Sequence, residues 1–245
     1  MRRKCRWRNE GKLVHRDRAA CDRIGGAYTA FVFASEIRRL TGDMPPLIGA
    51  LLVERFAASP LAYHNLDHVR HLLEQLQAHF AAVLPERDRR ILRYAIWLHD
   101  LFYDVRAPDN ERRSADIGLA LLQWPEDEMR DFETCVMATK GHRTEERLPQ
   151  VMVDLDLSIL AAPRQEYRRY ALAVRDEYRA YADAIYRTGR IRVLDQLCDV
   201  PLFRLLSPAK GLAPDELERR ARDNMRWEQG RLHHGVGTIE ALLAD

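Results

Sequence analysis

From about residue 27 onward, apolar residues recur every three or four positions along the chain. Leu72 and Leu73 are followed by Leu76 and Phe80, a spacing typical of the buried face of an α-helix. The alternation of apolar and polar residues that marks a β-strand is absent from the sequence. Proline and glycine fall between the apolar segments and mark about ten helices. The pattern therefore predicts an all-α fold.

No internal repeat, low-complexity tract or long linker divides residues 27–245. We therefore expect one helical domain over this range, folded as a bundle. The chain has 245 residues, of which 47% are hydrophobic and 31% charged, as in globular proteins. A chain of this length buries a sizeable core without a disulfide or a structural metal. A bound metal would therefore not be needed for stability and could serve a function.

Charge is uneven along a chain whose formal net charge is only +2. Residues 1–26 hold nine Lys and Arg against three Asp and Glu. We expect a disordered basic arm here, and a targeting segment or an extension from an early start codon are the alternatives. The even overall charge balance argues against a protein whose main partner is a nucleic acid. Nucleic-acid binding would rest on this arm alone.

Cysteine spacing and hydropathy bear on the cellular setting. The four cysteines are far apart and form no C-x-x-C pair, so a reduced cytoplasmic setting is expected. The longest apolar run, residues 47–53, is much shorter than the roughly 20 residues that cross a bilayer. The sequence predicts no membrane span, and no pattern in it predicts an oligomeric state.

Residues 91–102 form the most apolar of the predicted helices. Tyr94 to Leu98 leave almost no polar face, so neighbouring helices should enclose this segment. It runs directly into His99 and Asp100. Burying an imidazole and a carboxylate together costs several kcal/mol unless they are paired or bind a cation. We therefore expect a functional site at this helix end.

Further histidines and aspartates offer partners for that pair. His64, His68 and His71 would share a helix face if the helix includes residue 64, although Asn65 suggests that it starts nearby. Asp154 and Asp156 interrupt a later apolar segment. Because they are two residues apart on a helix, at most one can face a common centre. Helical periodicity does not choose between them.

Three motifs in this order resemble the HD superfamily of metal-dependent phosphohydrolases. They are Y-H-N-x-x-H at residues 63–68, the His99-Asp100 pair, and D-L-S at residues 156–158. The stretch from Tyr63 to Ala162, with D-N-E-R-R-S-A at residues 109–115, is similar to bacterial proteins known as predicted HD-type phosphohydrolases. The resemblance implies an all-helical HD-type domain that holds its metal between helices.

The resemblance also implies roles for single residues. It matches the metal ligands to His68, His99, Asp100 and Asp156. It matches His64 to the histidine that protonates the leaving oxygen in related phosphodiesterases, and Asp100 is also expected to orient the attacking water. The implied cofactor is a divalent ion, drawn from Mn, Fe, Co, Ni, Zn or Mg.

Other polar residues nearby are candidates for substrate contact or catalysis. Lys140, His142 and Arg143 follow a predicted helix end, where they could hold a phosphate, and His142 is alternatively a ligand for a second metal. Asp104 and Glu111 lie just beyond the central pair and could contact metal-bound water. Helix capping by Asp109-Asn110, with Glu111 in the first turn, is an equally natural interpretation.

Departures from other branches of the superfamily narrow the expected reaction. Leu101 stands where the diiron oxygenases carry an acidic residue, and the Gly-Tyr-Pro signature of the cyclic-di-GMP branch is absent. Tyr103-Asp104 keeps only the second residue of the Glu-Asp pair of alarmone hydrolases. We expect hydrolysis of a phosphoester in a nucleotide or a related small phosphate. The alternatives are an alarmone pyrophosphohydrolase and an inactive binding protein with a structural metal.

Overall fold

The structure is a computed structural model that describes residues 40–207, 213, 215–234 and 236–244. The chain divides into two compact units, residues 1–42 and 43–245. The elements described below belong to the second unit. The predicted arm, residues 1–26, lies outside the described residues, so its boundary with a domain at 27–245 stays a prediction.

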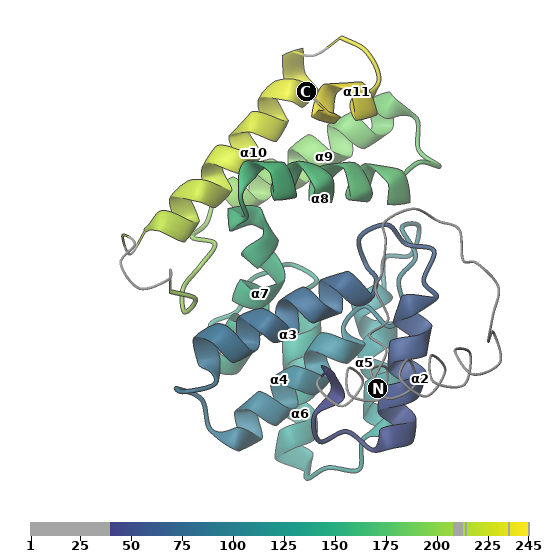
Figure 1. The fold of residues 1–245 in the computed structure, drawn as a ribbon, viewed down its shortest axis with the longest axis vertical. Coiled ribbons are helices and arrows are strands. Elements are labelled where there is room, and N and C mark those ends of the chain that lie inside the picture. Colours follow the sequence, from purple (N-terminus) through teal and green to yellow (C-terminus); the bar gives the residue numbers. More distant parts are fainter. Residues whose placement is uncertain (1–39, 208–212, 214, 235, 245) are drawn as a thin grey trace, which may run out of the picture. The chain divides into compact units, whose positions relative to one another are not determined.

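Ten α-helices and one 3₁₀ helix make up the described part of the chain, which contains no strand (Figure 1). The prediction of an all-α fold is confirmed. In chain order the helices are α2 (Pro46–Ala57), α3 (Leu66–Phe80), α4 (Glu86–Leu98), α5 (Asn110–Leu121), α6 (Glu126–Ala138), α7 (Arg147–Asp156), η1 (Leu157–Ala161), α8 (Arg164–Glu177), α9 (Asp183–Cys198), α10 (Glu216–His234) and α11 (Ile239–Ala244).

The second unit is built from two groups of helices that α7 and η1 connect (Figure 1). In the first group, α4 packs against α3 and α6, and α6 packs against α5 and α7. In the second group, α10 packs against η1, α9 and α11, while α8 packs against η1 and α11. The last residue of α7 thus lies at the junction of the two groups.

Helix α4 is the central element of the first group. Pro85 precedes it, and Glu86 and Asp88 stand in its first turn, where negative charge favours a helix start. Every residue from Tyr94 to Leu98 is buried, so the predicted enclosure of this segment is confirmed. Burial of a large aliphatic side chain such as Ile96 or Leu98 stabilises the fold by about 1.5–3 kcal/mol. The packed helix gives His99, which directly follows it, a rigid support.

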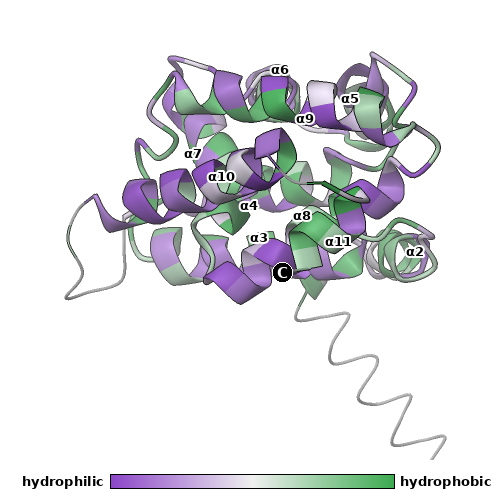
Figure 2. Ribbon diagram, turned by 90° about the horizontal axis from the view of Figure 1, so that it is seen from above, coloured by the Kyte–Doolittle hydropathy of each residue, from purple (hydrophilic) through white to green (hydrophobic). Residues whose placement is uncertain are grey.

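A buried ion pair ties the helices of the second group together. Nε of Arg190, on α9, lies 2.7 Å from Oε1 of Glu228 on α10. The hydroxyl of Tyr167, on α8, donates to the other oxygen of Glu228 at 2.5 Å. Figure 2 shows α10 as mostly hydrophilic in colour, so this pair lies on the buried side of a polar helix. Removing one charge of such a pair costs about 3–5 kcal/mol.

Two further features bear on the setting of the protein. Among the described residues, each helix is either too short or too polar to pass through a bilayer. Cys135 is buried and Cys198 half-buried, and both are free thiols. The other two cysteines lie outside the described residues.

Candidate metal centre

His99 follows the end of α4, and the backbone fixes the orientation of its ring. Nδ1 lies 3.0 Å from the carbonyl oxygen of Ile96, which only accepts, so Nδ1 carries the hydrogen and donates it. In the neutral ring, Nε2 then holds a lone pair that points away from α4. The side chain is 1% exposed, so Nε2 needs a partner other than bulk water.

His68 faces His99 from the first turn of α3. The side chain of Asn65 accepts from the backbone N–H of Asp67 at 2.9 Å, which starts α3 at Leu66. The two Nε2 atoms of His68 and His99 lie 3.3 Å apart. Two lone pairs at this distance repel unless a proton or a cation lies between them. Nδ1 of His68 is buried without a hydrogen-bond partner in the described structure.

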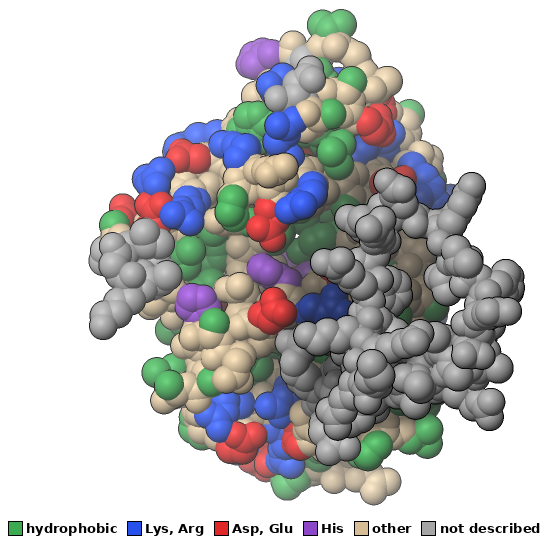
Figure 3. Space-filling view, viewed as in Figure 1, with side chains coloured by type: hydrophobic (Ala, Val, Ile, Leu, Met, Phe, Trp, Pro, Cys, Tyr) green, Lys and Arg blue, Asp and Glu red, His purple; other side chains and the backbone are tan. Residues whose placement is uncertain are grey.

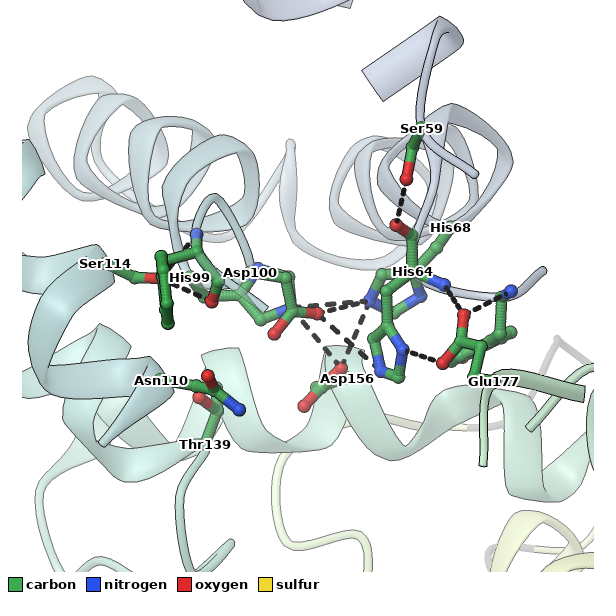
Figure 4. A network of polar contacts seen from close by, with 12 residues as sticks. Ser59, His64, His68, His99, Asp100, Asn110, Ser114, Thr139, Asp156 and Glu177 are labelled. Atoms are coloured by element: carbon green, nitrogen blue, oxygen red, sulfur yellow. Dashed lines mark hydrogen bonds and ion pairs between the residues drawn. The ribbon is translucent and has the colours of Figure 1, made fainter. Parts of the chain in front are cut away.

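Two carboxylates complete the group around these nitrogen atoms (Figure 4). Oδ2 of Asp100 lies 3.0 Å from Nε2 of His99 and 3.7 Å from Nε2 of His68. Oδ1 of Asp156, the last residue of α7, lies 3.7 Å and 3.5 Å from the same two atoms. The structure therefore brings together the four residues that the sequence predicts as ligands, from α3, the end of α4 and α7.

The spacing of these atoms fits a divalent metal ion. Ligands held about 2.1 Å from an ion stand about 3.0 Å apart in an octahedral shell and about 3.4 Å apart in a tetrahedral one. The distances among His68, His99 and Asp156 are 3.3, 3.5 and 3.7 Å, close to the tetrahedral value. One ligand atom each from His68, His99 and Asp156 lies within 4.8 Å of the other two. This group could hold a metal ion, with Asp100 against both imidazoles.

The charges of the group also favour a cation. Burial alone would raise the pKa of Asp100, but the adjacent His99 and His64 outweigh it and lower that pKa to about 2. The pKa of Asp156 is likewise lowered, against the effect of burial, by hydrogen bonds from His142, His68 and His99. Burial would lower the pKa of His99, yet Asp100 and Asp156 raise it well above its usual value. Without a metal ion, protonation of His99 is therefore favoured, because its positive charge balances the carboxylates.

The ambiguity between the two aspartates of α7 is resolved by their opposite directions. Asp154 is buried on the other side of the helix, where its carboxylate accepts from the backbone N–H groups of Leu205 and Leu206 at 2.6 and 2.7 Å. It also accepts from the side chain of Gln150 at 2.7 Å. Asp154 thus fixes the segment after α9, and Asp156 faces the imidazoles.

His64 does not belong to α3, because that helix begins two residues later. Its ring lies at the site from the preceding loop, with Nε2 3.9 Å from Oδ2 of Asp100. Nδ1 lies 2.7 Å from Oε2 of Glu177, whose other oxygen accepts from the backbone N–H groups of Tyr63 and His64 at 2.6 and 2.9 Å (Figure 4). The Glu177 carboxylate is 1% exposed. Sequence reasoning missed Glu177, because the sequence of this polar helix does not distinguish it from the other charged residues.

The surroundings of His64 favour its protonated form. Burial lowers its pKa, but the charges of Asp100 and Glu177 and the hydrogen bond to Glu177 raise it above the usual 6.5. The ring of Tyr103 stacks on the imidazole, with the ring centres 3.9 Å apart and an angle of 24° between the planes. This stacking fixes the plane of the ring, while Glu177 fixes its rotation. The free edge carrying Nε2 is directed toward the metal-ligand group.

His71 does not join that group. Its Nε2 lies 2.8 Å from the hydroxyl oxygen of Ser158 in η1. Burial lowers the pKa of His71. His71 therefore links α3 to η1.

The loop between α6 and α7 brings the three predicted substrate contacts to the same region. His142 has a backbone φ of 52°, a conformation that is uncommon for a residue other than glycine. Its Nε2 lies 3.1 Å from Oδ2 of Asp156, the oxygen turned away from the imidazoles. The Lys140 ammonium donates to the carbonyl of Pro108 at 2.9 Å, and Arg143 is exposed. His142 therefore supports a candidate ligand, and Lys140 and Arg143 lie on the same loop.

The structure does not bring Asp104 to the site. Asp104 is exposed, and its Oδ1 accepts from the backbone N–H of Arg106 at 2.9 Å. The side chain of Asn110 forms two hydrogen bonds with the backbone of Asp104, at 3.0 and 2.9 Å. Asp109 stands at the N-cap of α5 but makes no side-chain capping bond. Glu111, which the sequence singled out as well, does line the cavity described next.

One cavity of about 840 Å³ borders the candidate centre. His64, Asp100 and Asp156 line it on one side together with the Lys140–Arg143 loop, and residues of α8 and α9 line the other. On the face that Figure 3 draws, histidine side chains lie among acidic and basic groups. The volume is typical of a site for a small organic molecule.

No protein-family model, curated protein or solved structure matches the chain.

Proposed function

We propose that the protein is a metal-dependent phosphohydrolase of the HD superfamily that hydrolyses the phosphoester of a nucleotide or a related small phosphate. One observation carries the proposal. Two imidazoles and two carboxylates converge at the side of a cavity, next to a separate histidine that a buried glutamate holds. A metal site alone would not require that third histidine.

His68, His99, Asp100 and Asp156 are the residues that would hold the metal. When bound, a divalent ion lowers the pKa of its water and offsets the negative charge that grows on the phosphoryl oxygens. Two nitrogen and two oxygen donors suit Mn, Fe, Co, Ni or Zn better than Mg, which prefers oxygen ligands. The low pKa of Asp100 keeps that carboxylate ionised, so its oxygens remain acceptors at neutral pH.

His64 supplies the proton for the leaving group in this mechanism. Glu177 accepts the Nδ1 hydrogen, so the proton available for transfer is on Nε2, on the side of Asp100. The raised pKa keeps the ring protonated near neutral pH, as a general acid requires. A proton given to the departing alkoxide oxygen leaves a neutral imidazole whose Nδ1 hydrogen stays bonded to Glu177.

Lys140 and Arg143 are the residues proposed to bind the phosphate. Both line the cavity on the side of the candidate centre. Lys140 gives one N–H to Pro108 and keeps two more for a ligand. A guanidinium such as that of Arg143 can bond two phosphate oxygens at once. Asp104 has no part in this mechanism, because its carboxylate is bound within its own loop.

The test compares the parent with His64→Gln and Asp100→Ala on a panel of phosphoesters that includes nucleotides and guanosine tetraphosphate. We expect His64→Gln to lower kcat by roughly 100-fold or more while the metal content stays at the parent level. Asp100→Ala should lose both metal and activity. Cleavage restricted to guanosine tetraphosphate would support the alarmone alternative. A metal-loaded parent that hydrolyses nothing on the panel would overturn the proposal in favour of a binding protein.

A further inference from the structure

The side of the cavity opposite the candidate centre is formed by one face of α9. Ile185, Gly189 and Val193 follow at intervals of four residues and all line the cavity. Ile185 is 61% exposed and Val193 45% exposed, although both are large apolar residues. Leu197 and Val200 continue the same lining. Helix α9 thus presents an apolar surface that no part of the described structure covers.

Helix α8 and the turn after it add aromatic rings to this side. Tyr170, Val174 and Tyr178 line the cavity, again at intervals of four residues. Tyr181 lies in the turn that follows and Tyr186 in α9. The ring centres of Tyr178 and Tyr181 are 5.9 Å apart, and the rings are tilted by 33°. Tyrosine rings offer flat, uncharged surfaces that stack on other rings.

Charge is distributed unequally between the two sides. Among the described residues of α8 and α9 that line the cavity, Arg190 alone is charged. Its guanidinium is bonded to both oxygens of Glu228, at 2.7 and 3.0 Å, so its charge is balanced inside the protein. Lys140 and Arg143 stand on the opposite side. A ligand that fits this arrangement has an anionic end and an uncharged, apolar end.

We propose that the α8–α9 side of the cavity binds a planar aromatic ring, a nucleobase, of a phosphoester whose phosphate lies at the candidate metal centre. This inference rests on the proposed function. A phosphate fills little of a cavity of about 840 Å³, and the remainder offers room for a nucleoside. Tyr103 joins the two sides, because it stacks on His64 and lines the cavity.

Gly189 gives a direct way to test the ring site. A Cβ added there meets no atom within 4 Å, and Ile185 and Val193 on either side point into the same face. A tryptophan at this position therefore occupies the ring side of the cavity. Gly230 on α10 also has nothing within 4 Å of an added Cβ, and it does not line the cavity. Gly230→Trp is thus a matched control for Gly189→Trp.

The experiment compares kcat/KM for the four common nucleoside 5′-monophosphates with that for ribose 5-phosphate, which has the phosphoester but no ring. At least one nucleotide should exceed ribose 5-phosphate by about tenfold or more, as expected from base stacking. This ratio should fall toward one in Gly189→Trp and stay at the parent value in Gly230→Trp. Equal kcat/KM for ribose 5-phosphate and every nucleotide would overturn the inference.

Calorimetric binding of the four nucleosides, which carry no phosphate, separates this inference from the proposed function. We expect the parent and Gly230→Trp to bind at least one nucleoside and Gly189→Trp to bind it at least about tenfold more weakly. This result without any phosphoester hydrolysis would support the ring site and contradict the hydrolase. Hydrolysis of nucleotides with equal nucleoside binding by both variants would support the hydrolase and overturn the ring site.

Discussion

Nδ1 of His64 lies 2.7 Å from Oε2 of Glu177, although 113 residues separate them in the sequence. The same carboxylate accepts the backbone N–H groups of Tyr63 and His64 through its other oxygen. Glu177 therefore fixes both the loop before α3 and the ring that this loop carries. This contact joins the end of α8 to the candidate metal centre, which otherwise comes from α3, α4 and α7.

Glu177→Gln should change the pH dependence of the reaction. Glu177 helps to raise the pKa of His64, and a protonated His64 is the active form of a general acid. Without the carboxylate this pKa falls, so activity should be lost at a lower pH on the alkaline side of the profile. We expect kcat at neutral pH to fall about tenfold or more. A pH profile of kcat for the metal-loaded protein measures this shift.

Asp176→Asn is the matched control, because Asp176 is the neighbour of Glu177 and pairs with Arg179 on the surface. It should keep the parent profile. An unchanged alkaline limb in Glu177→Gln, with the metal content intact, would show that Glu177 does not act through His64.

Asp154→Ala should destabilise the fold without acting on the metal. The buried carboxylate accepts from Gln150, Leu205 and Leu206, and its removal leaves these donors unpaired. The expected loss is about 2–4 kcal/mol in the free energy of unfolding. Urea unfolding of the metal-free protein measures it. Asp156→Ala, two residues along the same helix, should lose metal, whereas Asp154→Ala should keep it, and equal metal content in the two variants would contradict these roles.

His142→Asn should weaken metal binding while leaving the fold intact. The imidazole of His142 bonds the outer oxygen of Asp156, and loss of such a supporting contact typically costs about 10–100-fold in metal affinity. Asparagine tolerates the positive φ of this position better than most residues, so the backbone should keep its course. Competition with a metal indicator dye gives the dissociation constant. His79→Asn, on α3 away from the centre, should not change it.

Metal affinity should rise with pH. The pKa of His99 is raised well above its usual value because Asp100 and Asp156 outweigh burial, so an ion must displace a proton from this ring. Below that pKa the affinity should increase about tenfold per pH unit, and above it the increase should stop. In the metal-free protein, the free energy of unfolding changes with pH in the opposite direction. The stabilisation by protonated His99 is full below the unfolded pKa of 6.5 and is lost as pH rises through the raised value. Calorimetric titrations in buffers of different ionisation enthalpy count the protons released, and affinity independent of pH would contradict this account.

The parts of the site that follow from local sequence were predictable. The apolar run of α4 and its buried end at His99 arise from residues adjacent in the chain. His68 and Asp156 also lie on helices whose apolar periodicity the sequence shows, although the choice of Asp156 over Asp154 came from the resemblance to a family. The reason for that choice, the capture of Asp154 by Leu205 and Leu206, depends on a segment about 50 residues away.

The parts that depend on tertiary contact could not be predicted. Glu177 resembles its charged neighbours in α8 until the fold sets it against His64. Asp104 is close to Asp100 in sequence, but the loop turns its carboxylate back to Arg106. The cavity lining from α8 and α9 likewise exists only once these two helices pack beside the centre.

The metal content of the purified protein tests the central claim most directly. It should be measured by mass spectrometry after supply of manganese, cobalt or zinc, for the parent, His68→Gln and His71→Gln. Both histidines lie on α3 three residues apart, but only His68 faces His99, while His71 contacts Ser158. We expect about one ion per chain in the parent and in His71→Gln, and none in His68→Gln. A parent that binds no ion, or a His68→Gln variant that retains it fully, would contradict the account.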